Sequence, residues 1–256
     1  MLPRLSVLAT CAALLFGAGP AHAQDGFLFK RPSAQLTLKG GPLIPRAHSE
    51  LFDFMVDTLT LERSDFRTPW IGADFAILVG PRLDVALGVA FAETESRSEF
   101  RYWEGVDGLP IEQTTRLRTV PVTVTARYHL LDRGREVSSL AWIPNRVTPY
   151  LAGGAGLTWY RLLQEGEFVG QPVGDDPLER DIFVSRLQSR GYGLTGHAGA
   201  GLDYWFSPRV GLNTELRYMV GSAPVGGDYR GRTPSERWDD IDLSGFQAAV
   251  GLTFRW

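Results

Sequence analysis

The last twelve residues alternate strictly in polarity, and this stretch limits the folds that are open to the whole chain. Successive side chains of an extended chain point to opposite faces. One face is apolar and carries Phe246, Ala248, Val250, Leu252, Phe254 and Trp256, and the other is small or polar and carries Gln247, Ala249, Gly251, Thr253 and Arg255. The stretch therefore predicts a β-strand whose apolar face needs an apolar environment and whose last side chain is an indole.

The amino terminus has the three regions of a secretory signal peptide. Arg4 gives a positively charged start, residues 5–16 are apolar, and Ala21-His22-Ala23 is a small-x-small cleavage site. Residues 1–23 are therefore expected to be a signal peptide, and residues 24–256 the mature domain. The apolar run is too short to predict a transmembrane helix.

Cys11 is the only cysteine, and it lies in the apolar run of the leader. A lipoprotein anchor at Leu8-Ala9-Thr10-Cys11 is the alternative interpretation, but it needs Thr10 where a smaller residue is usual. An ordinary apolar role in the leader is preferred. It leaves the mature chain without disulfides or thiol chemistry.

Charge and composition narrow the class of protein. The formal net charge is −3 for the whole chain, and it becomes −4 when Arg4 leaves with the leader. This balance does not favour nucleic acid as a partner. No later segment has 18 uninterrupted apolar residues, which excludes helical membrane spans. The 29 glycines, 14 phenylalanines and 8 tyrosines are typical of a β protein.

Eight segments of the mature chain alternate as β-strands do. They are residues 34–41, 68–79, 83–92, 116–130, 148–162, 191–206, 210–220 and 245–256. Pro121 falls on the polar face of the fourth segment and predicts a bulge or kink, because proline has no N–H for the ladder. The two faces of the fifth segment stay unassigned, because Gly153, Gly154 and Gly156 leave both sides small.

The connections between these strands alternate in length. Gly80-Pro81-Arg82 and Ser207-Pro208-Arg209 are tight turns, and residues 131–147 form a moderate link on the same side. The other connections are long and polar. The pattern predicts an all-β fold: an eight-stranded antiparallel up-and-down transmembrane β-barrel with long extracellular loops and short periplasmic turns.

The segment 201–218, GLDYWFSPRVGLNTELRY, together with the aromatic-terminated last strand, resembles the final hairpins of the OmpA-like/OmpX-like superfamily of outer-membrane β-barrels. The pattern of alternating strands resembles this superfamily over nearly all of the mature chain. The residue types themselves resemble it only over about the last 60 residues. The resemblance implies a location in the outer membrane of a Gram-negative bacterium. It also implies that Val250, Leu252, Phe254 and Trp256 act as a C-terminal signal for the barrel assembly machinery. The sequence ends at the barrel, so no peptidoglycan-binding domain is expected.

The polar faces of the strands place charged residues in the lumen. From their positions in the alternation of each strand, eight charged residues are expected to point inward, four of each sign. They are Lys39, Asp74, Asp84, Arg127, Asp203, Glu215, Arg217 and Arg255. An eight-stranded barrel is only wide enough for its side chains to fill. A closed plug of ion pairs is therefore the preferred interpretation, and a gated ion pathway is the alternative.

Catalysis is not expected. His129 and His197 share the parity of the lumen residues, and neither stands in a His-x-Ser pattern that would pair a base with a nucleophile. The chain has no Gly-x-Ser-x-Gly, His-Glu-x-x-His or phosphate-loop motif. We expect no catalytic, cofactor-binding or metal-binding residues.

Aromatic residues near the strand ends predict two rings of interfacial anchors. They are Trp70, Phe91, Tyr128, Tyr192, Tyr204, Phe206, Tyr218, Phe254 and Trp256. In the first long loop, residues 51–56 are unusually apolar, and they would extend a hairpin, cover the barrel mouth or contact a partner.

These observations lead to an expected role in envelope structure, adhesion or recognition through the loops. The main alternative is a narrow pore or small-solute transporter, and a lipid-modifying enzyme is a weaker one. Expected partners are outer-membrane lipid and lipopolysaccharide, with the barrel assembly machinery and periplasmic chaperones during biogenesis. No nucleic acid is expected, and the protein should be a monomer.

Overall fold

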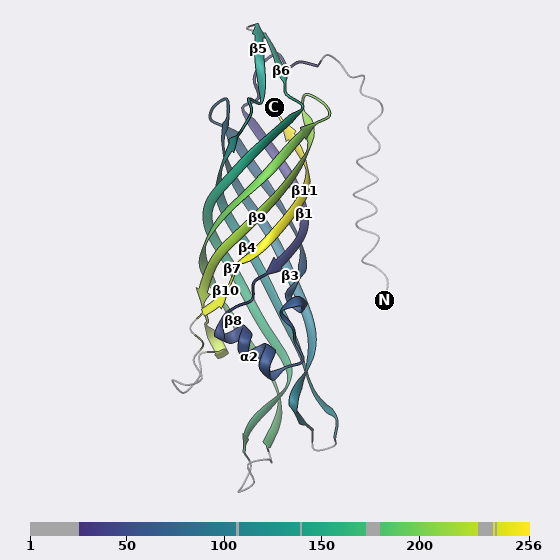
Figure 1. Cartoon of the computed structure of the whole chain (residues 1–256). Helices are drawn as coiled ribbons and strands as arrows, with labels where there is room; N and C mark the ends of the chain where they lie inside the picture. Colours follow the sequence, from purple (N-terminus) through teal and green to yellow (C-terminus); the bar gives the residue numbers. More distant parts are fainter. Residues whose placement is uncertain (1–25, 106–107, 139, 173–179, 230–237, 239) are drawn as a thin grey trace.

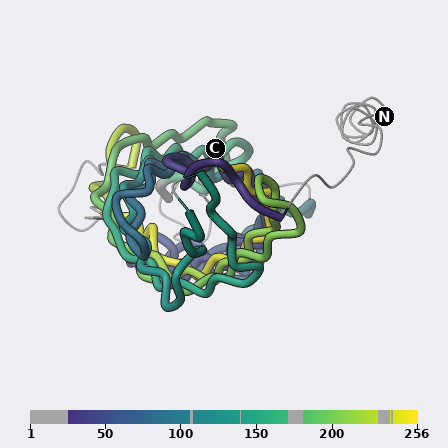
Figure 2. The backbone as a smooth tube through the Cα atoms, turned by 90° about the horizontal axis from the view of Figure 1, so that it is seen from above, coloured from purple at the N-terminus to yellow at the C-terminus, as the bar shows by residue number. Residues whose placement is uncertain are grey.

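The computed structural model describes residues 26–256, except 106–107, 139, 173–179, 230–237 and 239. The expected signal peptide and its cleavage site lie outside the described residues. Eight antiparallel strands close into a barrel, which appears as a ring when it is viewed along its axis (Figures 1 and 2). The ring consists of β1 (Ala34–Pro45), β2 (Thr68–Leu78), β3 (Leu83–Glu104), β4 (Pro110–His129), β7 (Val147–Pro172), β8 (Arg180–Trp205), β9 (Val210–Pro224) and β11 (Gly245–Arg255).

The first and last strands close the ring. β1 pairs with β11 from Gln35 opposite Arg255 to Pro45 opposite Gly245. All eight predicted strands are present, each within or overlapping one strand of the ring. A closed ring leaves no strand edge unpaired in its wall, so the up-and-down barrel predicted from the alternation is confirmed.

Smaller elements lie at both ends of the barrel. They are helix α2 (Glu50–Thr58), the 3-10 turns η1 (Arg63–Phe66) and η2 (Gly227–Tyr229), and the short strands β5 (Gly134–Ser138), β6 (Ala141–Pro144) and β10 (Asp240–Asp242). The β5–β6 hairpin lies at the end that holds the C-terminus and the tight turns, which we call the termini end (Figure 1). The opposite end is the hairpin end. None of the helices in the described ranges is long and apolar enough to cross a membrane.

The long strands β3, β4, β7 and β8 continue beyond the barrel wall at the hairpin end (Figure 1). The sequence predicted polar loops after Ala92 and before Gly191, but β3 runs on to Glu104 and β8 already begins at Arg180. The ladder continues because opposite charges face each other across the strands, as Glu95 does with Arg116 at 2.6 Å.

Two other predictions about the strands need correction. Pro121 causes no bulge: β4 keeps one register with β7 on both sides of it, and the only irregularity with β3 lies between Glu99 and Glu104. Trp70 is not an interfacial anchor. It is buried inside the barrel because it lies four residues before Asp74 on β2 and therefore points to the same, inner face. Its indole N–H donates to the carbonyl oxygen of Ala248 at 3.2 Å.

The fifth predicted strand, residues 148–162, is part of β7, and the burial of its side chains shows which of its faces points into the barrel. Tyr150, Ala152 and Thr158 are buried, whereas Leu151 and Leu157 are exposed. The even-numbered residues of this part of β7 therefore face the lumen.

The barrel has an inverted distribution of polarity. Exposed apolar side chains cover its outer wall, and they include Leu38, Ile71, Ile77, Leu87, Val89, Val124, Leu151, Leu194, Leu216 and Val250. Polar and charged side chains fill the inside. Apolar patches of this extent are uncommon on soluble monomers, whereas apolar-out and polar-in alternation is the rule for membrane barrels. The outer wall is therefore suited to hydrocarbon.

Candidate functional site

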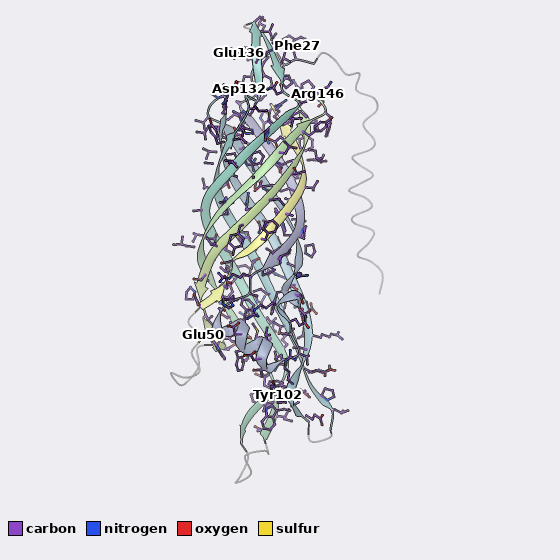
Figure 3. The ribbon with its side chains drawn as sticks, in the orientation of Figure 1. Phe27, Glu50, Tyr102, Asp132, Glu136 and Arg146 are labelled. Carbon is purple, nitrogen blue, oxygen red and sulfur yellow. The ribbon has the colours of Figure 1, made fainter. Side chains whose placement is uncertain are left out.

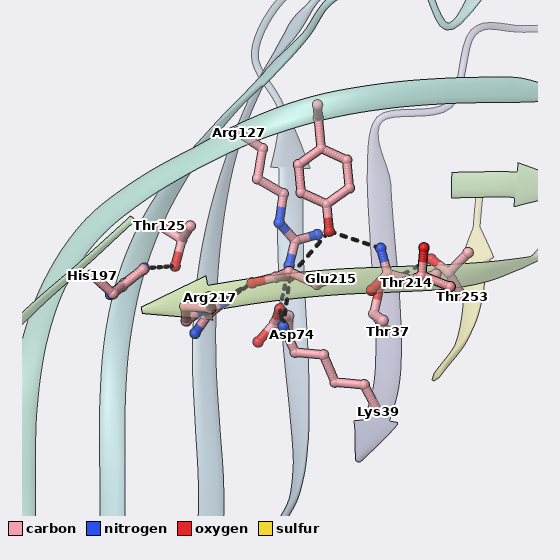
Figure 4. A network of polar contacts seen from close by, with 12 residues as sticks. Thr37, Lys39, Asp74, Thr125, Arg127, His197, Thr214, Glu215, Arg217 and Thr253 are labelled. Atoms are coloured by element: carbon pink, nitrogen blue, oxygen red, sulfur yellow. Dashed lines mark hydrogen bonds and ion pairs between the residues drawn. The ribbon is translucent and has the colours of Figure 1, made fainter. Parts of the chain in front are cut away.

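Charged side chains from β1, β2, β4 and β9 form a network of alternating charges inside the barrel (Figure 4). Lys39 on β1 lies between two carboxylates: its Nζ is 2.6 Å from Asp74 Oδ2 and 3.0 Å from Glu215 Oε2. The guanidinium of Arg127 pairs with Asp74. Arg217 Nε donates to Glu215 Oε1 at 2.7 Å. Every charge in this chain has an opposite neighbour, which offsets the cost of burying it.

Two neutral side chains extend the network toward the termini end. Tyr150 donates its hydroxyl hydrogen to Glu215 Oε2 at 3.0 Å, and Asn213 Nδ2 donates to the Tyr150 oxygen at 2.9 Å. Asn213 Nδ2 also donates to Asp203 Oδ1 at 2.7 Å. Asp203, which the sequence placed with the other lumen charges, therefore joins them through Asn213 and Tyr150.

A second polar cluster lies at the termini end. Asp84 accepts from Arg133, and its Oδ2 is 2.8 Å from His129 Nε2. Arg255 Nε donates to the carbonyl oxygen of Pro208 at 2.8 Å. Its guanidinium carbon lies 3.5 Å from the centroid of the Trp205 ring and 5.0 Å from that of Trp142, so this cation contacts two indoles near the termini end.

The hairpin end is closed by an apolar core instead. Leu51, Phe52 and Met55 of α2 are buried in one cluster with side chains of β7, β9 and β10. Phe52 and Phe66 pack edge to face with ring centroids 4.9 Å apart. Of the three roles left open for residues 51–56, covering the barrel mouth is the one that the structure shows.

A polar contact supports this core from the side. The Tyr229 hydroxyl donates to Gln164 Oε1 at 2.6 Å, and Gln164 Nε2 donates to Thr115 Oγ1 at 3.1 Å. Burial raises the pKa of Tyr229, and the nearby Asp228 carboxylate raises it further. The phenol therefore remains neutral and acts as a hydrogen-bond donor.

A cavity of about 10 Å³ lies beside the charge network, bordered by Lys39, Trp70, Asp74, Arg217, Met219 and Gln247 among others. That volume holds about one water molecule.

All eight lumen residues named from the sequence are buried inside the barrel: Lys39, Asp74, Asp84, Arg127, Asp203, Glu215, Arg217 and Arg255. The structure joins the first two with Arg127, Glu215 and Arg217, and it separates Asp84 and Arg255 into the termini-end cluster.

The sequence pattern did not predict that Tyr150, Arg133 and Trp142 take part in the charge network or the termini-end cluster. Tyr150 lies on the strand whose faces were unassigned, and a regular alternation from Thr148 would have found it. Arg133 and Trp142 lie in the 131–147 link, where no periodic pattern signals that the chain turns back over the barrel.

His197 has one contact that sequence neighbours could not indicate. Its Nε2 lies 2.9 Å from Thr125 Oγ1, which brings an imidazole and a hydroxyl together in the lumen. Its Nδ1 has no hydrogen-bond partner among the described residues, so no third group orients the ring. The described ranges also hold no group of three or more His, Cys, Asp or Glu side chains arranged to bind a metal ion.

Exposed side chains lie at both ends of the barrel, among them the labelled Tyr102 at the hairpin end and Asp132 at the termini end (Figure 3). Tyr102 stands on the β3–β4 hairpin with 78% of its surface exposed. At the termini end, Asp132 pairs with Arg82 at 2.7 Å, and this exposed pair lowers the pKa of the Asp132 carboxyl.

The sequence matches no protein-family model, and no curated protein matches it. Several solved structures are similar in shape. The outer membrane protein OprG from Pseudomonas aeruginosa is 13% identical and covers 90% of this chain and 99% of its own, with a TM-score of 0.48. Neisserial surface protein A is 14% identical, with coverage of 91% and 98% and a TM-score of 0.43.

The outer membrane protease OmpT from Escherichia coli is also similar, at 10% identity, with coverage of 90% and 98% and a TM-score of 0.41. These similarities concern the course of the backbone. The ring of eight antiparallel strands, the apolar outer wall and the polar lumen are properties of this chain itself. On those properties, the chain has the fold of an eight-stranded outer-membrane β-barrel.

Proposed function

We propose that this protein is an integral outer-membrane barrel with a structural and surface-interaction role, and that it is neither a channel nor an enzyme. Its wall would lie in the bilayer with the hairpin end outside the cell. The observation that carries the proposal is a buried charge network across the lumen with an apolar core at the hairpin end, combined with hairpins that project beyond the barrel wall.

The charge network in the lumen supports a structural role over transport. The charge network crosses the middle of the barrel, and the cavity beside it has room for about one water molecule. Ions would have to break several buried ion pairs to pass. One observation favours the narrow-pore alternative: the same charged side chains line the lumen.

The projecting hairpins support an interaction role. Val184 on β8 is 80% exposed and Tyr102 on β3 is 78% exposed, although both are large apolar or aromatic residues. Binding residues are often carried on segments that a rigid scaffold holds in place. The barrel supplies that scaffold, because β3, β4, β7 and β8 run without a break from the barrel wall into the projecting hairpins.

The Thr125–His197 contact does not support catalysis. Both side chains are buried in the lumen, and the His197 ring lacks a third group that would fix its tautomer. A general base also needs access to a substrate. Neither side chain is exposed, so a substrate outside the barrel would not reach them.

The test is ion conductance of the purified full chain in planar bilayers. We expect no unitary current steps from the wild type, and we expect steps from the Trp70→Ala/Arg217→Ala double variant, which widens the space beside the small cavity. Regular steps from the wild type would favour the pore. Unboiled and boiled samples on a gel provide the control, because a closed membrane barrel should change mobility on boiling. A water-soluble protein without that change would reject the membrane placement.

A further inference from the structure

Three arginines lie side by side on the outer wall at the hairpin end. Arg118 on β4 is directly opposite Arg161 on β7, and Arg161 is directly opposite Arg190 on β8. Directly opposite residues have Cβ atoms about 5 Å apart, and like charges in such positions destabilise a sheet. An uninterrupted row of three therefore needs a counter-charge.

The protein supplies only part of that counter-charge. Glu93, which is opposite Arg118 on β3, pairs with it at 2.9 Å. Arg161 donates to the neutral side-chain oxygen of Gln188 at 2.8 Å. In the part of the chain that the structure describes, no carboxylate forms an ion pair with Arg161 or Arg190. The row thus holds three positive charges against one negative charge.

An apolar row runs directly below the arginines. Two residues toward the middle of each strand, and so on the same face, lie Phe91, Val120, Trp159 and Tyr192. Trp159 is paired with Val120 on one side and with Tyr192 on the other. Tyr192 is 67% exposed, and the Arg118 guanidinium carbon lies 5.5 Å from the centroid of the Phe91 ring.

The order of the two rows indicates what the arginines contact. Exposed aromatic side chains on a membrane barrel lie at the level of the lipid headgroups. Arginine binds phosphate through parallel N–H donors. A lipid whose acyl chains lie along Trp159 and Tyr192 would therefore carry its phosphate at the level of Arg161 and Arg190.

We propose that Arg118, Arg161 and Arg190 form a binding site for the phosphate headgroup of an anionic lipid in the leaflet at the hairpin end. The inference rests on the proposed membrane placement. It goes beyond that placement by assigning the site and the phosphate chemistry of its ligand.

The test compares diphosphoryl lipid A with the same lipid after removal of its phosphates. Each lipid is titrated into the refolded full chain in detergent, and binding is measured by native mass spectrometry. We expect the Arg118→Gln/Arg161→Gln/Arg190→Gln variant to bind diphosphoryl lipid A at least about tenfold more weakly than the wild type, since it loses three positive charges that would contact the lipid phosphate. Binding of the dephosphorylated lipid should be the same for both.

The matched control removes three exposed arginines at the termini end by Arg82→Gln, Arg135→Gln and Arg209→Gln, with the same change in net charge. It should bind diphosphoryl lipid A as the wild type does. An equal loss in this control, or no loss in the first variant, would overturn the proposal. Complete displacement of the lipid by millimolar inorganic phosphate would also overturn it, because the site would then bind a free anion.

Folding is checked by the mobility shift on boiling. If the triple variant does not fold, the Arg190→Gln variant serves instead, because Arg190 is exposed and its loss breaks no ion pair within the described ranges. A wild type without a mobility shift would reject the membrane placement itself. A normal shift with unchanged lipid affinity in the variants would reject the arginine site alone.

Discussion

At the scale of single residues, Lys39 links the two carboxylates of the central charge network. Among the described residues it is the only cation with an ion pair to both Asp74 and Glu215, and those carboxylates bind Arg127 and Arg217 in turn. A buried ion pair can cost as much to desolvate as it gains from attraction, but removing one partner leaves a buried charge uncompensated. The network should therefore respond strongly to the loss of one member.

Replacement of Lys39 by methionine tests this response. Lys39→Met keeps a similar length but leaves two carboxylates without their shared cation, and we expect a loss of about 3–5 kcal/mol in the free energy of unfolding. Guanidinium-induced unfolding in lipid vesicles measures it. Arg186→Met is the control, because Arg186 and Glu165 form an exposed pair at 2.9 Å whose loss should cost less than about 1 kcal/mol. Equal effects of the two variants would contradict a stabilising role for the network.

Gly201 makes room for Tyr150. A Cβ atom at this position would lie 2.4 Å from the Tyr150 hydroxyl oxygen and 2.6 Å from the carbonyl oxygen of Thr214. Gly201→Ala should therefore displace Tyr150 from Glu215 and destabilise the barrel by about 1–3 kcal/mol. Gly196→Ala on the same strand is the control, because its Cβ would meet nothing closer than 3.7 Å. The same unfolding midpoint for both variants would argue against close packing at Gly201.

At the scale of elements, the wall of the barrel was predictable and its two closures were not. The strands follow from alternation, because lipid on one side and a polar lumen on the other impose a period of two. Helix α2 has only a short apolar pattern at Leu51, Phe52 and Met55, which is equally compatible with a loop that contacts a partner. The β5–β6 hairpin packs Trp142 against Arg255, two residues that are far apart in the sequence and share no local pattern.

The closure at the hairpin end should be visible in an alkaline titration. The raised pKa of Tyr229 means that its neutral form is favoured in the folded state, so its contribution to stability is present below pH 10 and decreases as the pH rises above the ordinary value of about 10. Tyrosine ionisation is followed by ultraviolet absorbance. In the folded protein, Tyr229→Phe should remove no ionising tyrosine up to about pH 11.

The control for this titration is the unfolded chain. In concentrated denaturant, wild type and Tyr229→Phe should differ by one tyrosine that ionises near pH 10. If the folded proteins already differ by one tyrosine near pH 10, Tyr229 is not held neutral, and the apolar core at the barrel mouth is open to water.

At the scale of the whole molecule, one seam closes the barrel. β11 lies between β9 and β1 and pairs with both. The backbone of Trp256 adds hydrogen bonds to the chain just before and at the start of β1. The Trp256 N–H donates to the carbonyl oxygen of Ala34 at 3.1 Å, and its own carbonyl oxygen accepts from the Ser33 N–H at 2.8 Å. The indole contributes little to this seam: it is 55% exposed, and it contacts the Phe75 ring at a centroid distance of 6.2 Å.

Because the seam is held by the Trp256 backbone and not by its indole, a change of this side chain can distinguish an effect on folding from an effect on assembly in the cell. If the terminal aromatic is read by an assembly machinery, Trp256→Ala should reduce the amount of heat-modifiable protein in outer membranes severalfold. The same variant, refolded from urea into detergent, should reach the wild-type yield, because the backbone bonds to Ser33 and Ala34 remain. Tyr128→Ala is the matched control, since Tyr128 is also an exposed aromatic at the termini end, at 50%, but lies on β4. Equal losses in cells for the two variants would mean that Trp256 acts only as one more interfacial aromatic. A loss of refolding in detergent would instead show that the indole itself holds the seam.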